Sequence, residues 1–296
     1  MKIFEFCPFF NEHRIAALKI REAGYWIDEL HICEADMNFS YVPKPYHFDT
    51  SQTSEKVKHH KIAAGGLFRP ALPEQSYYDP HSCPPEMFDQ WYWHLLTHNM
   101  GYHNEAMQRN SCSLMKDIVG EEDIIILSDL DEFLDSRLAE QIITAVKRHQ
   151  IITVKLHFSV FYFNLFSDRS HGVDHFSYRT YVMTGKYFHK MPFTGDYLRK
   201  KGISGGLLQT VHCPDSYMGF HHSWLEHSVH AFDKLKAFDA NVKDKTLISG
   251  SFAADCIRNK RLPYIDADLY VDNNKPFLRS VLESDTAGLW FSENTL

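Results

Sequence analysis

Acidic residues two positions apart follow a short aliphatic run and give the clearest chemical signal in the sequence. The run Ile124-Ile125-Ile126-Leu127 leads through Ser128 into Asp129, Asp131 and Glu132. On an extended backbone, Asp129 and Asp131 lie on the same side, where two carboxylates repel unless they share a proton or a cation. Carboxylate oxygens suit Mg²⁺ or Mn²⁺, and substrate phosphates can complete the coordination. The pattern predicts a metal-diphosphate site.

The alternative is a solvated acidic turn before the next helix, with Asp135 or Ser136 as the N-cap. The aliphatic run itself is too short for a typical helix and is typical of a buried parallel strand, because both faces of such a strand are covered. Ligands of open α/β sheets bind just beyond the carboxyl ends of their strands. That position favours the metal site.

The beginning of the chain predicts a parallel βαβ unit. Residues 2–7 and 28–34 have strand character, and residues 12–23 between them have a helical apolar face that Gly24 ends. Such a unit pairs its strands in parallel through a right-handed crossover. Asn11, Glu12 and Glu34 would then lie at strand carboxyl ends, near Asp129 and Asp131.

Two further groups of residues could complete a site. Either His221 or His222 could supply a neutral imidazole to the metal, although paired histidines are more often structural. Glu105, Gln108 and Arg109 lie at helical spacing and share one face of the expected helix. The simpler interpretation of these three residues is a helix face exposed to solvent.

Composition sets the broad class. The chain has 296 residues, 44% of them hydrophobic, a net charge of −7 and no apolar stretch long enough for a membrane span. Without a basic run, nucleic acid is not an expected partner. No Cys-x-x-Cys spacing occurs, and Cys7 and Cys33 fall inside expected strands, so reduced thiols and a cytoplasmic location are expected. No linker divides the chain, which predicts one domain.

The remaining segments carry weaker signals. A region rich in proline and glycine covers residues 39–85, with a short strand possible at 61–64. The other expected elements are helices at 86–119 (broken near Gly101), 136–149, after 224 and 251–260, strands at 151–158, 160–166 and 178–187, and a flexible loop around 202–206. The tail from residue 261 to 296 has no clear pattern.

Several motifs, taken in order, resemble glycosyltransferase family 17, the group that contains the bisecting N-acetylglucosaminyltransferase of N-glycan processing. The matching segments are Phe6-Cys7-Pro8-Phe9-Phe10-Asn11-Glu12, Ile32-Cys33-Glu34-Ala35-Asp36, Lys44-Pro45, Glu105-Ala106-Met107-Gln108-Arg109, Leu127-Ser128-Asp129-Leu130-Asp131-Glu132 and Gly219-Phe220-His221-His222-Ser223-Trp224. The resemblance covers residues 2 to 240. Phe220 replaces a tryptophan of the family, and Ala35-Asp36 replaces Ser-Asn. The animal enzymes carry a membrane anchor that this sequence does not show, so a Golgi N-glycan is not the expected acceptor.

The resemblance implies an α/β, GT-A-like nucleotide-diphospho-sugar transferase fold, with a mixed, mostly parallel sheet flanked by helices. One catalytic domain would span residues 1–296, with a nucleotide-binding half over about 1–135 and an acceptor-side half over about 136–296. The implied reaction is inverting transfer of a sugar, GlcNAc from UDP-GlcNAc, onto a hydroxyl of a glycan or glycoconjugate.

The resemblance also assigns roles to the residues already singled out. Asp131, Asp129 and His221 would hold Mn²⁺ or Mg²⁺ against the diphosphate, with Asp129 also able to contact the ribose. The nucleotide sugar would be bound by Phe10, Asn11, Glu12, Glu34 and Asp129, and by Arg109 at the diphosphate. An inverting transfer needs a carboxylate base, for which Glu226, Glu132 and Asp196 are candidates, with Glu226 ranked first because it follows the His221 segment.

Two other functions fit parts of the pattern. A metal-dependent phosphohydrolase would use Asp129 as its nucleophile after the aliphatic strand, but it would need that strand to begin the catalytic domain. A sugar-binding protein on a transferase fold would have no need to keep Asp129, Asp131 and His221 together.

Overall fold

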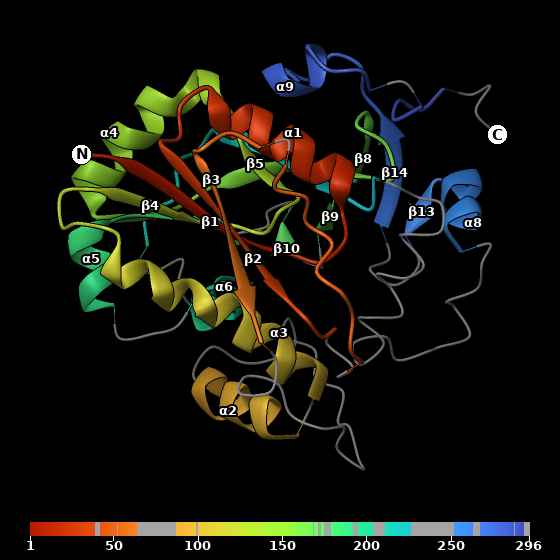
Figure 1. Cartoon of the computed structure of the whole chain (residues 1–296). Coiled ribbons are helices and arrows are strands. Elements are labelled where there is room, and N and C mark those ends of the chain that lie inside the picture. The colour runs from red at the N-terminus through yellow and green to blue at the C-terminus, as the bar shows by residue number, and fades with distance from the viewer. Residues whose placement is uncertain are drawn as a thin grey trace.

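The structure is a computed structural model. It describes residues 1–38, 42–51, 53–63, 87–98, 100–167, 169–170, 173–174, 179–191, 195–203, 211–225, 252–262, 267–286 and 288–292. Within these ranges the chain forms two six-stranded sheets with helices packed around them (Figure 1). None of the described helices is both long and apolar enough to cross a bilayer.

The first sheet contains the strands expected at the start of the chain. Its order is β3 (Val57–Ile62), β2 (Glu29–Ala35), β1 (Ile3–Phe9), β4 (Ile124–Leu127), β11 (Tyr181–Thr184) and β6 (Ile151–Thr153). β1 pairs in parallel with β2 and β4, and β2 pairs in parallel with β3, whereas β11 is antiparallel to β4 and β6. The predicted α/β class, with a mixed and mostly parallel sheet, is confirmed.

Alternation along β1 explains how helices cover both faces of this sheet. Ile3, Cys7 and Phe9 pack with the apolar residues of α1 (His13–Gly24) and α4 (Ala139–His149). Phe4 and Phe6 point to the opposite face, because successive side chains of a strand alternate. That face is covered by η4 (Ser111–Asp117), α5 (Gly185–Lys190) and α6 (Gly195–Ile203), with α2 (Phe88–His98) and α3 (Met100–Asn110) below them in Figure 1.

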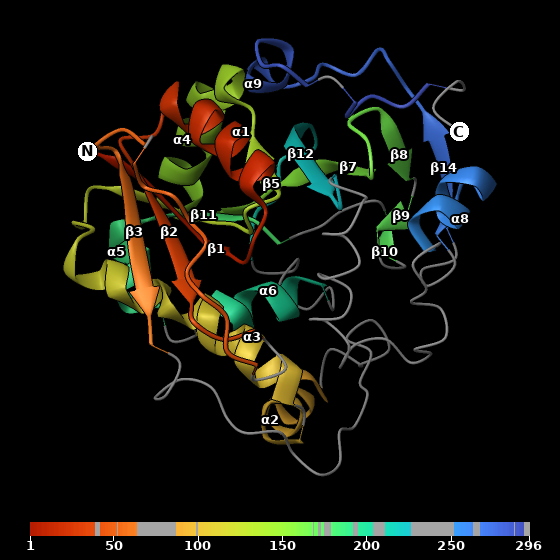
Figure 2. The ribbon, with the colours of Figure 1, turned by 45° about the vertical axis from the view of Figure 1, so that its right-hand side comes forward.

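The second sheet begins directly after the acidic segment. Its order is β13 (Arg261–Leu262), β14 (Ala267–Val271), β8 (Leu165–Ser167), β7 (Lys155–Val160), β12 (Tyr217–Ser223) and β5 (Glu132–Leu134). Figure 2 shows it extending from β5, near β1, toward β14 on the other side of the molecule. Smaller elements complete the described fold: β9 (Arg169–Ser170), β10 (Val173–Asp174), η5 (Ser136–Leu138), α8 (Phe252–Asn259) and α9 (Arg279–Leu282).

Several predicted boundaries are wrong. The third strand covers Val57–Ile62 rather than 61–64, and the long helix of 86–119 is divided into α2, α3 and η4. The strand expected at 178–187 ends at Thr184, whose side chain accepts a hydrogen bond from the Tyr187 amide and caps α5. The strand expected at 151–158 is divided between the two sheets as β6 and β7.

Other outcomes concern the tail, the helix ends and the cysteines. The tail without a clear pattern contains β13, β14 and α9. Gly24 is the last residue of α1, and the cap is Tyr25 rather than Gly24. The cysteines in the described ranges are free thiols, as expected: Cys7, Cys33, Cys112, Cys213 and Cys256. The helix expected after residue 224 lies outside the described residues.

Candidate functional site

The acidic segment forms the turn that carries the chain from the first sheet to the second. The Glu132 amide donates to the carbonyl oxygen of Asp129 at 3.1 Å, so the backbone turns here rather than continuing as an extended strand. The expectation that Asp129 and Asp131 lie side by side on an extended strand is therefore wrong. Their side chains have different partners, and the site consists of two parts.

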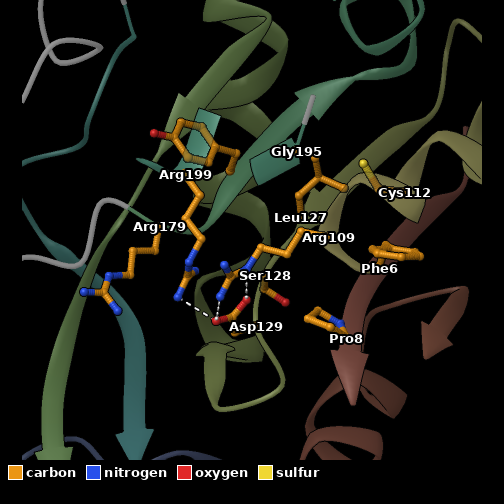
Figure 3. Close-up of a pocket in the computed structure, with 11 residues that line it drawn as sticks. Phe6, Pro8, Arg109, Cys112, Leu127, Ser128, Asp129, Arg179, Gly195 and Arg199 are labelled. Carbon is orange, nitrogen blue, oxygen red and sulfur yellow. Dashed lines mark hydrogen bonds and ion pairs between the residues drawn. The ribbon is translucent and has the colours of Figure 1, made fainter. Parts of the chain in front are cut away.

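Asp129 is bound by two arginines. Arg109 donates from Nε and Nη2 to the two carboxylate oxygens at 3.1 and 3.0 Å, and Nη2 of Arg199 lies 2.6 Å from Oδ2 (Figure 3). Burial raises the pKa of Asp129, but the two guanidinium groups outweigh it and hold that pKa well below its usual range. Asp129 is a fixed anion. With both oxygens occupied, it is poorly placed to be the nucleophile that the hydrolase alternative requires.

The arginines are themselves held by a second set of acids. Arg109 contacts Glu105 at 2.7 Å and Asp196 at 3.1 Å, and Lys200 contacts Glu105 at 3.1 Å. Burial raises the pKa of Glu105, but Arg109 and Lys200 lower it to about 2. The solvated-face interpretation of this side of α3 is wrong, because Glu105 is only 5% exposed. Helical spacing places Glu105, Gln108 and Arg109 on one face of α3, and this face is buried.

Gln108 and Lys19 attach this cluster to the first sheet. Gln108 donates to the carbonyl oxygen of Phe9 at 3.2 Å and so fixes α3 at the end of β1. Lys19 on α1 is 1% exposed and forms a 2.5 Å ion pair with Glu5 of β1. It also donates to Ser128 and to the carbonyl oxygen of Glu132. A buried cation under the acidic turn thus holds the turn's backbone in place.

Asp131 faces the second sheet. Its Oδ1 lies 3.5 Å from Nε2 of His221 on β12, and its carbonyl oxygen accepts the His222 amide at 2.8 Å. His221 and His222 point to opposite sides, as residues next to each other in a strand must. Nδ1 of His222 lies 2.6 Å from Ser159 Oγ, and burial lowers the pKa of His222 to about 3. His222 is therefore a neutral core residue, and His221 is the one at the site.

The pair Asp131 and His221 fits a divalent ion. A carboxylate oxygen and an imidazole nitrogen are donors that Mn²⁺ accepts and Mg²⁺ tolerates, and Nε2 of His221 is the ring nitrogen that faces Asp131. The described residues contain no group of three or more His, Cys, Asp or Glu side chains placed to hold a metal. A metal here would take its other ligands from substrate and water. The metal-ligand role of Asp129 stays a prediction.

The candidate bases differ in how available they are. Glu132 is fully buried and accepts from Arg199 at 2.9 Å, Thr180 at 2.7 Å and the Asp129 amide at 3.1 Å. Asp196 is also fully buried and accepts from Arg109 and from Tyr92, each at 3.1 Å. These contacts make both carboxylates ion-pair partners within the cluster. Glu226 lies outside the described residues, and its role stays a prediction.

The residues predicted to bind the nucleotide lie at the ends of β1 and β2. Oε2 of Glu12 accepts the amides of Phe10 and Asn11, each at 3.1 Å, and closes the turn after β1. Glu34 is fully buried and accepts from Lys44 Nζ at 2.7 Å, so it ties β2 to the segment after it.

The segment attached by Glu34 completes this end of the sheet. Its amides of His47 and Phe48 donate to Glu34 at 2.7 and 3.1 Å. Nζ of Lys44 lies 5.6 Å from the centre of the Phe10 ring. Glu34 therefore positions the segment beside Phe10, and the nucleotide-binding roles stay predictions.

A cavity lies on the Asp129 side of the turn. Its lining comprises Phe6, Pro8, Arg109, Cys112, Leu127, Ser128, Asp129, Arg179, Tyr181, Gly195 and Arg199 (Figure 3). Sequence reasoning missed Arg179, Arg199 and Lys200. Arg199 and Lys200 belong to the run Arg199-Lys200-Lys201, a local cluster of positive charge that could have indicated partners for the acidic turn. Arg179 had no such signal.

Comparisons with known proteins give distant likenesses only. No protein-family model matches the chain, and no curated protein sequence matches it either. Membership of glycosyltransferase family 17 therefore stays a prediction.

Two solved structures resemble the chain in architecture. The galactosyltransferase LgtC, in complex with donor and acceptor sugar analogs, is 9% identical with a TM-score of 0.35, over 73% of this chain and 74% of LgtC. TarS 1–349 of S. aureus is 8% identical with a TM-score of 0.33, over 80% of this chain and 63% of the TarS chain.

Proposed function

We propose that the chain is a metal-dependent inverting glycosyltransferase that moves a sugar, GlcNAc from UDP-GlcNAc, onto a glycan hydroxyl. The observation that carries the proposal is the pairing of Asp131 with His221, 3.5 Å apart, beyond the carboxyl end of β4. Ligands of open α/β sheets bind at this edge. An oxygen and a nitrogen donor placed there suit an ion that holds a diphosphate.

Asp131 and His221 would hold Mn²⁺ or Mg²⁺, which when bound neutralises charge that develops on the departing nucleoside diphosphate. Phe10, Asn11 and Glu12, at the end of β1, would bind the base and ribose. Asp129, kept ionised and immobile by its two arginines, would accept hydrogen bonds from ribose or sugar hydroxyls that reach its exposed edge.

Inversion requires one base that takes the proton of the acceptor hydroxyl as the hydroxyl attacks the anomeric carbon. Of the three candidates, Glu132 and Asp196 are held in ion pairs by Arg199 and Arg109. A carboxylate whose oxygens are held by buried hydrogen-bond donors is not placed to take a proton from an acceptor hydroxyl. Glu226, which follows β12 and His221 in the chain, is the candidate that we assign to this role.

A donor screen tests the proposal. The protein is incubated with Mn²⁺, each nucleotide sugar and a panel of oligosaccharides, and free nucleoside diphosphate is measured. We expect release with UDP-GlcNAc that an acceptor accelerates and that Asp131→Asn abolishes. The exposed variant Glu140→Gln, which makes the same chemical change on α4, should keep full activity. No nucleotide release from any donor would contradict the proposal.

The stereochemistry of the product tests inversion separately. A single displacement on an α-linked donor gives a β-linked product, and proton NMR of the anomeric centre distinguishes the two. An α-linked product would show that the reaction retains configuration and that Glu226 is not a base of an inverting transfer.

A further inference from the structure

Arg179 lines the cavity, and its guanidinium has no hydrogen-bond or ion-pair partner among the residues that the structure describes. It lies two residues before the start of β11, and in Figure 3 it points away from Asp129, whereas Arg109 and Arg199 point toward Asp129. Its Nε is enclosed and forms no hydrogen bond. No described residue forms an ion pair with it. Among the arginines of this cavity, Arg179 differs in this respect from both others.

The surrounding charges do not explain why an unpaired guanidinium is kept here. Burial lowers the pKa of Arg179 to about 10, with Arg199 acting in the same direction and Glu132 and Asp129 opposing it. The acids of the cluster already have closer cations: Asp129 and Glu132 pair with Arg199, and Glu105 and Asp196 pair with Arg109. A partly buried cation without a partner is unfavourable unless something supplies the missing acceptor.

We infer that Arg179 binds the phosphoryl oxygens of the donor's diphosphate. This inference rests on the proposed function and names the residue that contacts the leaving group. A guanidinium offers several N–H donors in a plane that match two phosphate oxygens at once. Arg109, which was expected to take this role, is held by three carboxylates, and its contacts with them engage four of its five N–H donors. Arg179, which lines the same cavity as Asp129, fills the role instead.

The competing account is that Arg179 only balances the charge of the four acids at a distance. The two accounts make different predictions for lysine. Charge balance is kept by Arg179→Lys, whereas two-pronged binding of an oxyanion is lost, because an ammonium lacks the planar fork. The two accounts also predict different melting temperatures for a variant that lacks the charge of Arg179. Removing a charge that balances the cluster lowers the melting temperature of the free protein, whereas removing an unpaired charge leaves it unchanged or raises it.

The experiment compares wild type, Arg179→Gln, Arg179→Lys and the exposed control Arg148→Gln on α4. Titration calorimetry measures the binding of UDP, uridine and inorganic pyrophosphate in the presence of Mg²⁺, and thermal unfolding is recorded without ligand. We expect Arg179→Gln to lose about ten- to a hundredfold in affinity for UDP and for pyrophosphate, with uridine binding unchanged. Arg179→Lys should lose less affinity for UDP and pyrophosphate than Arg179→Gln, but a measurable amount. Arg148→Gln should bind both with wild-type affinity.

The probes separate the inference from the proposed function. Wild-type affinity of Arg179→Gln for UDP and pyrophosphate would overturn the inference while leaving the proposed function intact. Wild-type affinity in Arg179→Lys combined with a lower melting temperature in Arg179→Gln would also overturn it, in favour of charge balance. If wild type binds pyrophosphate through Arg179 but binds neither UDP nor UDP-GlcNAc, the oxyanion site stands and the nucleotide-sugar function fails.

Discussion

At the scale of single residues, Arg109 has the largest number of charged contacts in the site. It pairs with Glu105, Asp129 and Asp196 at once, and its side chain is only 11% exposed. A lysine at this position could reach one of these carboxylates but could not contact all three in one plane. The others would be left as buried charges without a partner, which is strongly unfavourable.

Arg109→Lys should therefore lower the free energy of unfolding by about 2–4 kcal/mol, measured by denaturant titration. Arg21→Lys is the matched control, because Arg21 pairs with Glu283 at the surface and both side chains are at least 40% exposed. That control should unfold like wild type. If Arg109→Lys also unfolds like wild type, the three ion pairs contribute no net stability.

Residue types and spacing predicted part of this site. Helical spacing placed Glu105, Gln108 and Arg109 on one face, and strand alternation separated His221 from His222. The two arginines on Asp129 were not predictable in the same way. Arg199 lies 70 residues after Asp129 in the sequence, and only the packing of α6 beneath the sheet brings the two together. Burial of the α3 face depends on the same packing.

At the scale of elements, the close approach of β12 to β5 fixes where His221 lies. A Cβ added to Gly219 would come within 1.9 Å of the carbonyl oxygen of Phe133, so no larger residue fits without moving one strand. Because β5 follows Asp131 and β12 carries His221, this pairing determines how far apart the two predicted ligands are.

Gly219→Ala should lower the free energy of unfolding by more than about 2 kcal/mol, because two strands must separate to admit the methyl group. It should also weaken metal-dependent nucleotide binding in the fraction that remains folded. Gly24→Ala is the control, since nothing lies within 4 Å of a Cβ there and alanine favours the end of α1. Equal stability of the two variants would show that β12 and β5 pair more loosely than in this structure.

The edge of the first sheet holds a histidine that should make stability depend on pH. Nδ1 of His31 on β2 lies 2.8 Å from Nε2 of His60 on β3, and burial, followed by His60, lowers the pKa of His31 to about 4. Below pH 6.5 the unfolded chain takes up a proton at this residue that the folded chain does not. Stability should therefore fall as pH decreases from about 6.5 toward 4.

His31→Gln should reduce the slope of unfolding free energy against pH. The reduction should be at most about 1.4 kcal/mol per pH unit, which is the contribution of one proton. Unfolding free energies measured between pH 7 and pH 4.5 test it, with the exposed His13→Gln on α1 as a comparison. An unchanged slope in His31→Gln would mean that the pair takes up its proton in the folded state.

The sequence predicted the elements of the first sheet better than those of the second. In the first sheet, β4 (Ile124–Leu127) is a continuous apolar run that can be recognised locally. The division of residues 151–160 between two sheets has no local signal, because no proline or glycine separates β6 from β7. β14 alternates between buried and exposed positions, a pattern that was present in the sequence but went unnoticed in the tail.

At the scale of the whole molecule, the predicted metal site joins the two sheets. Asp131 belongs to the connection that leaves the first sheet, and His221 lies on β12, the neighbour of the edge strand β5 in the second sheet. An ion and a nucleotide bound by both should stabilise the two sheets together. Binding of this kind raises the melting temperature in proportion to the logarithm of ligand concentration.

We therefore expect UDP with Mn²⁺ to raise the melting temperature by several degrees, whereas UDP with EDTA leaves it unchanged. His221→Ala should abolish the increase, because the metal would lose one of its two protein ligands. His222→Ala should lower the melting temperature but keep the increase, because His222 is a core residue bonded to Ser159. An increase that persists in EDTA would contradict a metal-held diphosphate.

The order of strands in the first sheet also affects how the chain folds while it is being synthesised. β4 is a run of four buried aliphatic residues, and its second partner, β11, begins only at Tyr181. During synthesis the ribosome must translate more than fifty further residues before that partner exists. Until then one side of β4 is an unpaired, strongly apolar sheet edge, the kind of surface on which nascent chains associate. A growing chain of this protein should thus be a good client for the chaperones that attend the ribosome exit, and slowing translation between residues 128 and 180 should lower its soluble yield.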